Sequence, residues 1–119
     1  MKVTLAGLEG GDAVTCSRGV NLVPDATLED ALVGAKVYDV VVLPGGGPGA
    51  AALAASKQVP TAPATPDSPK VGELLKQQEL EERLVAAVCA APTALLAHGV
   101  FTGRRLTSYP AFRCLLLLL

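Results

Sequence analysis

Residues 84–96, LVAAVCAAPTALL, decide the fold of this chain. A short run of apolar residues that favour β-structure ends at Cys89, and an alanine-rich segment of helical character begins within a few residues of it. Pro92 suits the first turn of a helix, because the N–H group that proline lacks would be unpaired there. Gly99 suits the end of the same helix. The segment therefore predicts a strand, a sharp turn and a helix, with the Cys89 thiol at the corner.

The thiol of Cys89 has two interpretations on this stretch alone. A cysteine reacts as its thiolate, which a helix N-terminus favours through partial positive charge and free N–H groups. Small neighbours, Ala87 and Ala90, leave room around the sulfur. Alternatively, Cys89 is an ordinary buried cysteine, since free cysteine is among the most buried residue types.

A second strand, at residues 38–43, precedes a glycine-rich loop and another helix. Its β-branched apolar residues are typical of a strand that is buried on both faces. The loop, PGGGPG at residues 44–49, leads into an alanine-rich helix at residues 50–55. Glycines there let backbone N–H groups come close to a ligand or a neighbouring side chain. The spacing matches no nucleotide-binding fingerprint, and a plain connecting loop is the alternative.

Strand and helix signals alternate along the rest of the chain. Short strands are expected at residues 3–8, 13–16 and 20–23, the first of them buried, and a turn with the start of a short strand is expected at residues 101–106. Leu28–Leu32 is expected to be helical, with Asp25 or Thr27 as its cap. A further helix is expected to run from Pro69 to about Arg83, with one apolar side. The alternation predicts an α/β fold built on a parallel sheet.

Length and composition indicate one domain over residues 1–119. Half of the residues are hydrophobic but only 3% are aromatic, so the core is expected to consist of valine, leucine and alanine. Ten basic and eleven acidic residues without a basic cluster do not suggest a nucleic-acid site or a charged membrane surface. The leucine run at residues 115–119 is too short to span a bilayer.

Cysteine usage suggests an intracellular protein with reduced thiols. The three cysteines, Cys16, Cys89 and Cys114, are widely spaced, and the first residues do not resemble a signal peptide. With His98 as the only histidine, we expect no metal site and in particular no structural zinc.

Residues 59–70 are rich in proline and are expected to form an extended insertion that does not pack into the core. The P-x-x-P spacing would suit a ligand of an SH3-type domain. Thr65 and Ser68, each followed by proline, are candidate phosphorylation sites. An inert linker is the favoured interpretation.

Taken together, these segments resemble the ThiJ/PfpI family, and within it the deglycase group. The motifs that carry the resemblance are residues 3–8 with 16–18, 24–31, 38–46 and 86–98, in order and closely spaced. The resemblance implies a flavodoxin-like, three-layer α/β sandwich with a parallel sheet, here expected to be incomplete at both ends. It further implies a homodimer, no cofactor, and a location in the cytoplasm, with nucleus and mitochondrion as further possibilities.

The resemblance also implies roles for individual residues. Cys89 matches the family's nucleophilic and redox-sensing cysteine, which acts on small reactive carbonyls such as methylglyoxal and on glycated thiols or amines. Gly45, Gly46 and Ala90 match the pocket that holds an oxyanion or a sulfinate, with N–H groups of Gly46 and Ala90 as donors. Cys16 corresponds to a secondary oxidisable cysteine, and Arg18 is a weaker candidate for contacting an anion. Members are also described as redox-dependent chaperones.

Departures from the family pattern lead us to expect impaired catalysis. The family's glutamate belongs to a segment before the first residue of this sequence, and further strands follow its last residue. Tyr109 stands where the family has a histidine. His98, nine residues beyond Cys89 on the same helix, is too far to reach the sulfur and is expected to act as a C-terminal cap. The alternative function is a catalytically inactive fragment that acts as a redox-sensitive chaperone or binding module.

Overall fold

The computed structural model describes residues 1–34, 36–55 and 71–112. These residues fall into two compact units, Met1–Lys36 and Val37–Leu119. The proline-rich segment at residues 59–70, its predicted insertion and phosphorylation sites, and the closing leucine run all lie outside the described residues.

The first unit contains two small pairs of strands. Strand β1 (Ala6–Gly7) runs parallel to β4 (Ala26–Thr27), and β2 (Val14–Thr15) pairs in the antiparallel direction with β3 (Asn21–Leu22). A single 3₁₀ turn, η1 (Ser17–Gly19), reverses the chain between β2 and β3. The strands predicted at residues 13–16 and 20–23 are therefore confirmed, each shorter than the sequence suggests.

The expectation of a buried strand at residues 3–8 is wrong for most of its length. Only Gly7 of this segment is buried, and Val3 is 71% exposed. Hydrogen bonds with Asp25 occupy the residue before the first strand pair, so the pairing of β1 with β4 begins only at Ala6. The Asp25 carboxylate accepts a hydrogen bond from Leu5 N–H at 2.7 Å, and the Asp25 N–H donates to the Leu5 carbonyl at 2.8 Å. Asp25 therefore anchors this segment.

Helix α1 (Leu28–Leu32) forms where it is predicted, and of the two candidate caps it is Thr27 rather than Asp25 that caps it. The helix directly follows β4, a short strand that the sequence does not predict. Thr27 Oγ1 accepts a hydrogen bond from Asp30 N–H at 3.0 Å and donates one to the Asp30 carboxylate at 2.8 Å. This side-chain cap satisfies an N–H group that has no partner inside the helix.

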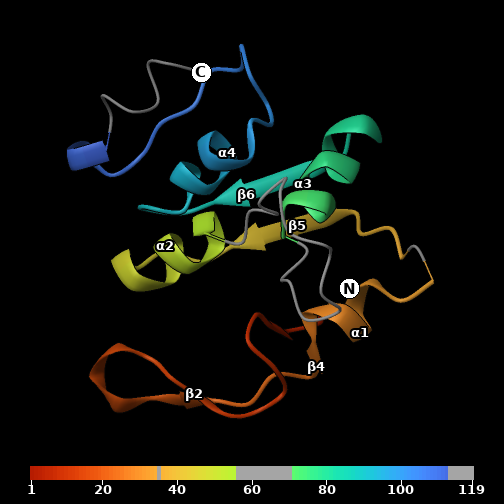
Figure 1. Cartoon of the computed structure of the whole chain (residues 1–119), viewed down its shortest axis with the longest axis vertical. Helices are drawn as coiled ribbons and strands as arrows, with labels where there is room; N and C mark the ends of the chain where they lie inside the picture. The colour runs from red at the N-terminus through yellow and green to blue at the C-terminus, as the bar shows by residue number, and fades with distance from the viewer. Residues whose placement is uncertain (35, 56–70, 113–119) are drawn as a thin grey trace, which may run out of the picture. The chain divides into compact units, whose positions relative to one another are not determined.

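The second unit is built on one parallel strand pair. Strand β5 (Val40–Leu43) pairs with β6 (Leu84–Ala87) in the register Val40 with Leu84 and Leu43 with Ala87, and their arrows run the same way in Figure 1. The Val88 N–H donates to the Leu43 carbonyl at 3.2 Å and carries the pairing one residue further. Parallel strands joined through helices are the arrangement that the alternating pattern predicts.

Strand β5 is not buried on both faces, which corrects the prediction for residues 38–43. Leu43 is buried, whereas Val40 and Val42 are 45% and 62% exposed. The register places Val40 beside Leu84, which is also exposed, on one face of the pair. In the described part of the chain, one face of this pair is therefore open and the other is packed.

Three helices accompany the strands, and their ends have clear physical causes. Helix α2 (Gly47–Ala55) begins before the predicted residue 50, because Ala50 N–H already donates to the Gly46 carbonyl at 2.8 Å. Helix α3 (Val71–Leu80) ends earlier than predicted in a Schellman motif, with Glu82 at φ 52° and hydrogen bonds that return to the last helical turn. Helix α4 (Pro92–His98) follows the carboxyl end of β6 and packs against α2 (Figure 1).

The core of the second unit consists of small and aliphatic residues, as the composition predicts. It comprises Leu43, Ala50, Val71, Leu74, Leu75, Ala90, Ala91, Ala94, Leu95 and Val100. The polar side chain of Gln78 is also buried and donates to the Leu84 carbonyl at 3.3 Å, which links α3 to β6. Burying an amide is tolerated when it is hydrogen-bonded in this way.

The turn predicted within residues 101–106 is confirmed, but the short strand expected to start there is not formed. The chain makes a turn there, with Arg104 N–H donating to the Phe101 carbonyl at 3.3 Å. Phe101 N–H is bound by the Glu79 carboxylate of α3, so it is unavailable to a strand partner. The short 3₁₀ turn η2 (Pro110–Phe112) closes the described part of the chain. Among the described residues, no helix has the length and apolar character needed to cross a membrane.

Candidate functional site

Cys89 lies between β6 and α4, at the predicted corner, and it is exposed. The alternative of an ordinary buried cysteine is therefore wrong. Its neighbours Ala90 and Ala91 are buried, so the chain turns inward directly after the thiol. The corner thus presents the sulfur at the surface and anchors the residues that follow in the core.

The backbone of Cys89 has a left-handed conformation, with φ 60°. For a residue with a side chain, this conformation costs about 1–2 kcal/mol. Such an outlier persists only where the surroundings hold it, and it often occurs at functional sites. The left-handed backbone of Cys89 therefore requires contacts from other segments to hold it.

Two donors hold the Cys89 carbonyl. Ser108 Oγ donates to it at 2.9 Å, and Tyr109 N–H donates to the same oxygen at 2.9 Å. A protein hydrogen bond contributes about 0.5–1.5 kcal/mol net. Together these two are of the size needed to offset the strain at Cys89.

Gly45 approaches Cys89 from the end of β5. A Cβ atom at Gly45 would lie 2.8 Å from Cys89 Cβ and 3.0 Å from the Val88 carbonyl oxygen. Contacts that short are not tolerated, so only glycine fits at this position. The prediction that the loop glycines let the backbone approach a neighbouring side chain holds at Gly45.

The two backbone N–H groups expected to face a substrate lie in the loops beside Cys89. Gly46 has φ 101° and uses its carbonyl to begin α2, and Ala90 uses its carbonyl to accept from Thr93. Within the described residues, neither the Gly46 N–H nor the Ala90 N–H donates to a protein acceptor. They remain predicted donors to an oxyanion or a sulfinate.

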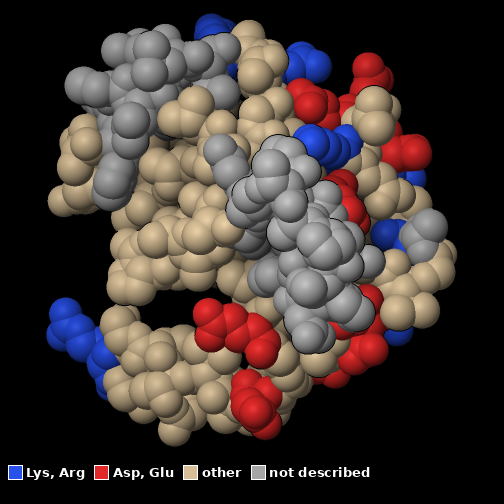
Figure 2. Space-filling view, in the orientation of Figure 1, with Lys and Arg blue, Asp and Glu red and all other residues tan. Residues whose placement is uncertain are grey.

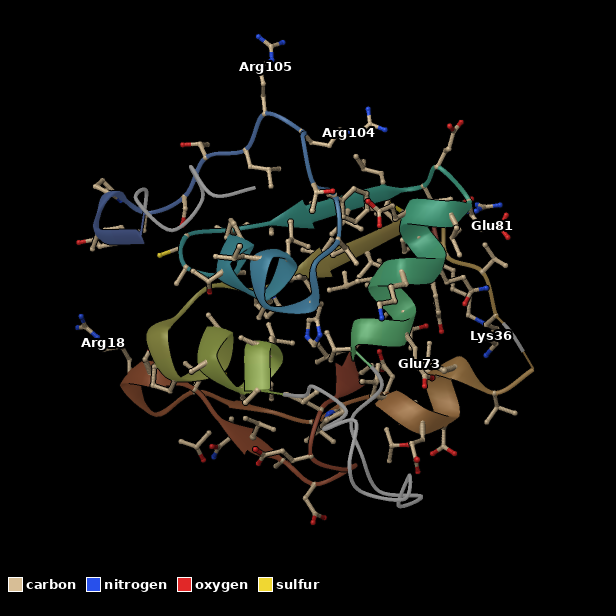
Figure 3. All side chains as sticks on the ribbon, turned by 45° about the horizontal axis from the view of Figure 1, so that its top comes forward. Arg18, Lys36, Glu73, Glu81, Arg104 and Arg105 are labelled. Atoms are coloured by element: carbon tan, nitrogen blue, oxygen red, sulfur yellow. The ribbon has the colours of Figure 1, made fainter. Side chains whose placement is uncertain are left out.

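The segments around the thiol carry no formal charge. Residues 40–55 and 84–103 contain no lysine, arginine, aspartate or glutamate. Arg104 and Arg105 follow directly, and Figure 3 shows their side chains extending away from the ribbon. Figure 2 marks the lysine, arginine, aspartate and glutamate side chains of the described residues on one face of the molecule. Residues 40–55 and 84–103 therefore bring no charged side chain to the corner.

His98 has a different role from the predicted helix cap. Its Nε2 atom lies 2.8 Å from the Leu53 carbonyl oxygen, and a Cβ at Gly72 would lie 2.7 Å from its Nδ1. His98 therefore connects α4 to α2 and packs against the start of α3. The end of α4 is formed instead by Gly99, at φ 65°, whose N–H reaches the last turn, as predicted.

Cys16 and Arg18 belong to the first unit. Cys16 is a free, partly buried cysteine whose N–H donates to the Val20 carbonyl at 2.7 Å. Arg18 lies in the β2–β3 reversal at φ 73°. The predicted roles of Cys16 in oxidation and of Arg18 in anion contact stay predictions.

A family model described as the DJ-1/PfpI family matches residues 1–116. The chain belongs to the DJ-1/PfpI family. This name covers the ThiJ/PfpI resemblance seen in the sequence, which is thereby confirmed.

Curated DJ-1/PfpI relatives share a high level of identity with this chain. It is 48% identical to Protein dj-1beta of Drosophila melanogaster over 95% of its own length and 53% of the relative's. It is 48% identical to the Parkinson disease protein 7 homolog of Danio rerio, over 91% of its length and 50% of the relative's. A glutathione-independent glyoxalase of Caenorhabditis elegans, DJR-1.2, is 38% identical over 87% of this chain and 47% of that protein. The chain thus spans about half the length of these relatives.

Solved DJ-1/PfpI structures confirm the fold class. The crystal structure of Drosophila melanogaster DJ-1beta matches 98% of this chain and 55% of that chain, with a TM-score of 0.79 and 47% identity. Oxidized Toxoplasma gondii DJ-1 matches 96% of this chain and 55% of that chain, with a TM-score of 0.77 and 30% identity. The fold is α/β and flavodoxin-like, as expected.

Sequence reasoning found the thiol corner of this DJ-1/PfpI chain but missed Ser108. Ser108 is only 9% exposed and lies 19 residues beyond Cys89. The sequence offers no periodic or capping signal that links the two positions. The sequence points to Tyr109 only through its side chain, whereas Tyr109 holds the Cys89 carbonyl through its backbone N–H.

Proposed function

We propose that this chain carries a glyoxalase- or deglycase-type activity toward methylglyoxal and its adducts, with Cys89 as the nucleophile. The observation that supports this most is the exposed Cys89 thiol on a strained backbone, closely approached by Gly45. The N–H groups of Gly46 and Ala90 lie in the adjoining loops and have no acceptor among the described residues. The glyoxalase named among the relatives supports the same class of substrate.

The first step follows from the chemistry of a thiol and an aldehyde. Cys89 Sγ adds to the aldehyde carbon, the carbonyl π electrons move to oxygen, and the thiol proton ends on that oxygen to give a hemithioacetal. Negative charge develops on the oxygen during this step. The N–H groups of Gly46 and Ala90 are the proposed donors that stabilise it. An uncharged site suits methylglyoxal, which is itself neutral.

The test is consumption of methylglyoxal by the purified chain, compared with Cys89→Ser and Cys16→Ser. We expect Cys89→Ser to abolish turnover, because the hydroxyl is a far weaker nucleophile at neutral pH. Cys16→Ser, which removes the thiol of the first unit, is the control and should retain turnover. Equal turnover by wild type and Cys89→Ser would remove Cys89 from any catalytic role.

We also propose that Cys89 senses oxidants. Its exposure favours this, and one of the matched solved relatives is an oxidized DJ-1. Two equivalents of peroxide convert the thiol to a sulfinic acid and release two molecules of water. After mild peroxide treatment, mass spectrometry should find the two added oxygen atoms on Cys89 before Cys16. Equal or preferential oxidation of Cys16 would contradict the proposal.

An inactive chain that binds other proteins is the alternative. The open face of the β5–β6 pair supports it, because Val40, Val42 and Leu84 are exposed there. In this case Cys89→Ser would still suppress aggregation of an unfolded client, and Val42→Lys would not. Turnover that depends on Cys89 would favour the enzyme over this alternative.

A further inference from the structure

The Cys89 carbonyl is held by a segment that the proposed function does not otherwise use. Ser108 Oγ and Tyr109 N–H both donate to this oxygen, each at 2.9 Å. The Ser108 side chain is largely shielded from solvent, so water competes little for its hydroxyl. The two contacts fix the direction of the carbonyl bond from the same side.

Fixing this carbonyl also fixes an N–H group. The Cys89 carbonyl and the Ala90 N–H belong to one planar peptide unit, and no cis peptide bond occurs in the described chain. In a trans peptide the C=O and N–H bonds point in opposite directions. Contacts that hold the carbonyl toward Ser108 and Tyr109 therefore turn the Ala90 N–H away from them.

Hydrogen bonds to the carbonyl also make this N–H a better donor. Successive hydrogen bonds through one peptide group polarise one another, so an oxygen that accepts two bonds leaves its N–H more positive. The Ala90 N–H has no acceptor among the described residues, although Ala90 is buried. It is oriented and polarised, and it has no partner in the part of the chain that the structure describes.

We propose that Ser108 is a positioning residue, which orients and polarises the Ala90 N–H as a donor to the oxygen of a carbonyl compound bound at Cys89. This inference rests on the proposed nucleophilic role of Cys89. Ser108 itself acts through the Cys89–Ala90 peptide and does not contact the substrate. Tyr109 supports the same carbonyl through its backbone, which a side-chain substitution leaves in place.

The experiment compares two reactions of the same thiol in the full chain. Methylglyoxal turnover passes through an oxyanion, whereas alkylation of Cys89 by iodoacetamide displaces iodide and forms none. Ser108→Ala should lower kcat for methylglyoxal about tenfold, less than the loss that follows direct removal of an oxyanion donor. The same change should leave the alkylation rate unaltered. Ser108→Thr keeps the hydroxyl, so its kcat should stay close to that of the wild-type chain.

Thr107→Ala is the matched control, because Thr107 is the exposed neighbour of Ser108 and has no hydrogen bond among the described residues. It should leave both reactions unchanged. Unchanged turnover in Ser108→Ala would overturn the proposal. So would an equal fall of turnover and alkylation, because that result indicates displacement of Cys89 itself. A kcat in Ser108→Thr as low as that of Ser108→Ala would also overturn it.

A spectroscopic arm separates this proposal from the proposed function. If the wild-type chain shows no turnover that depends on Cys89, the proposed function fails, and the amide proton of Ala90 then decides the present inference. Its NMR chemical shift should move in Ser108→Ala, because the peptide loses a polarising bond, and should stay in place in Thr107→Ala. An unmoved Ala90 amide in Ser108→Ala would contradict the orienting role of Ser108.

Discussion

Each unit has a corner at which a strand is followed by a helix, and the two corners are built differently. In the first unit, Thr27 ends β4 in extended conformation and caps α1 with its own side chain. In the second unit, the residue before α4 is Ala91, which is already helical and has no capping side chain. Between β6 and Ala91 the chain passes through the left-handed Cys89.

The difference shows how a corner can keep donors available. Thr27 bonds an N–H group that would otherwise need a partner, so the first corner is stabilised locally. The second corner leaves the Ala90 N–H unbonded among the described residues and carries strain at Cys89. Its support comes from Gly45, Ser108 and Tyr109, which are distant in the sequence. Under the proposed function, the second corner keeps a donor for a ligand, and contacts from the rest of the unit offset the cost of its strain.

The largest expected effect is at Gly45, because it tests whether the second corner depends on remote support. In Gly45→Ala the new methyl group would collide with Cys89 Cβ and the Val88 carbonyl, so we expect a loss of about 1–3 kcal/mol in the free energy of unfolding. Turnover of methylglyoxal should fall as well, because Cys89 must move.

Gly47→Ala is the control for Gly45→Ala. A Cβ at Gly47 would meet nothing within 4 Å, and alanine favours the helix that begins there. Denaturant unfolding should show no loss of stability in this variant. If the two variants have equal stability, Gly45 does not constrain Cys89.

A smaller effect is expected from the left-handed backbone itself. Cys89→Gly and Cys89→Ala both remove the thiol, but only glycine relieves the strain at positive φ. The glycine variant should be the more stable by about 1 kcal/mol. Thermal unfolding of the two variants measures this difference in stability. Because both variants lack the sulfur, its loss does not contribute to the difference.

Arg18 of the first unit also has a left-handed backbone, with φ 73°, so Arg18→Gly and Arg18→Ala form the matching pair of variants. Its turn is closed by bonds from Cys16 N–H to Val20 and from Gly19 N–H to Cys16, which use neither backbone group of Arg18. This residue can relax more easily than the clamped Cys89. The difference between Arg18→Gly and Arg18→Ala should therefore be smaller. An equal or larger difference at Arg18 would show that the contacts to the Cys89 carbonyl do not hold its conformation.

The same contrast explains what could be predicted from the sequence. The sequence narrows the cap of α1 to Asp25 or Thr27 and predicts the corner at Cys89, because each feature depends on residues adjacent in the chain. The contact of Ser108 with Cys89 spans 19 residues and that of His98 with Leu53 spans 45, so neither leaves a local pattern.

Strand burial was overestimated for a related reason. The β-branched composition of residues 38–43 shows that a strand forms there, but not which element covers each face. The register with β6 decides this, and it leaves Val40 and Val42 exposed on one face. Composition therefore predicted the strand and its parallel pairing, whereas the packing around it required the structure.

The smallest expected effect concerns the corner that is held locally. Thr27→Ala removes the cap of α1 and should lower the free energy of unfolding by about 0.5–1 kcal/mol. Thr27→Ser keeps the oxygen that accepts from Asp30 N–H and should recover most of this loss. Denaturant unfolding of the two variants checks the difference. Asp30→Asn serves as a second control, because it changes the partner of the Thr27 hydroxyl but leaves the bond from Asp30 N–H in place. Comparable losses in Thr27→Ala and Thr27→Ser would mean that the first corner, like the second, depends on contacts beyond its own cap.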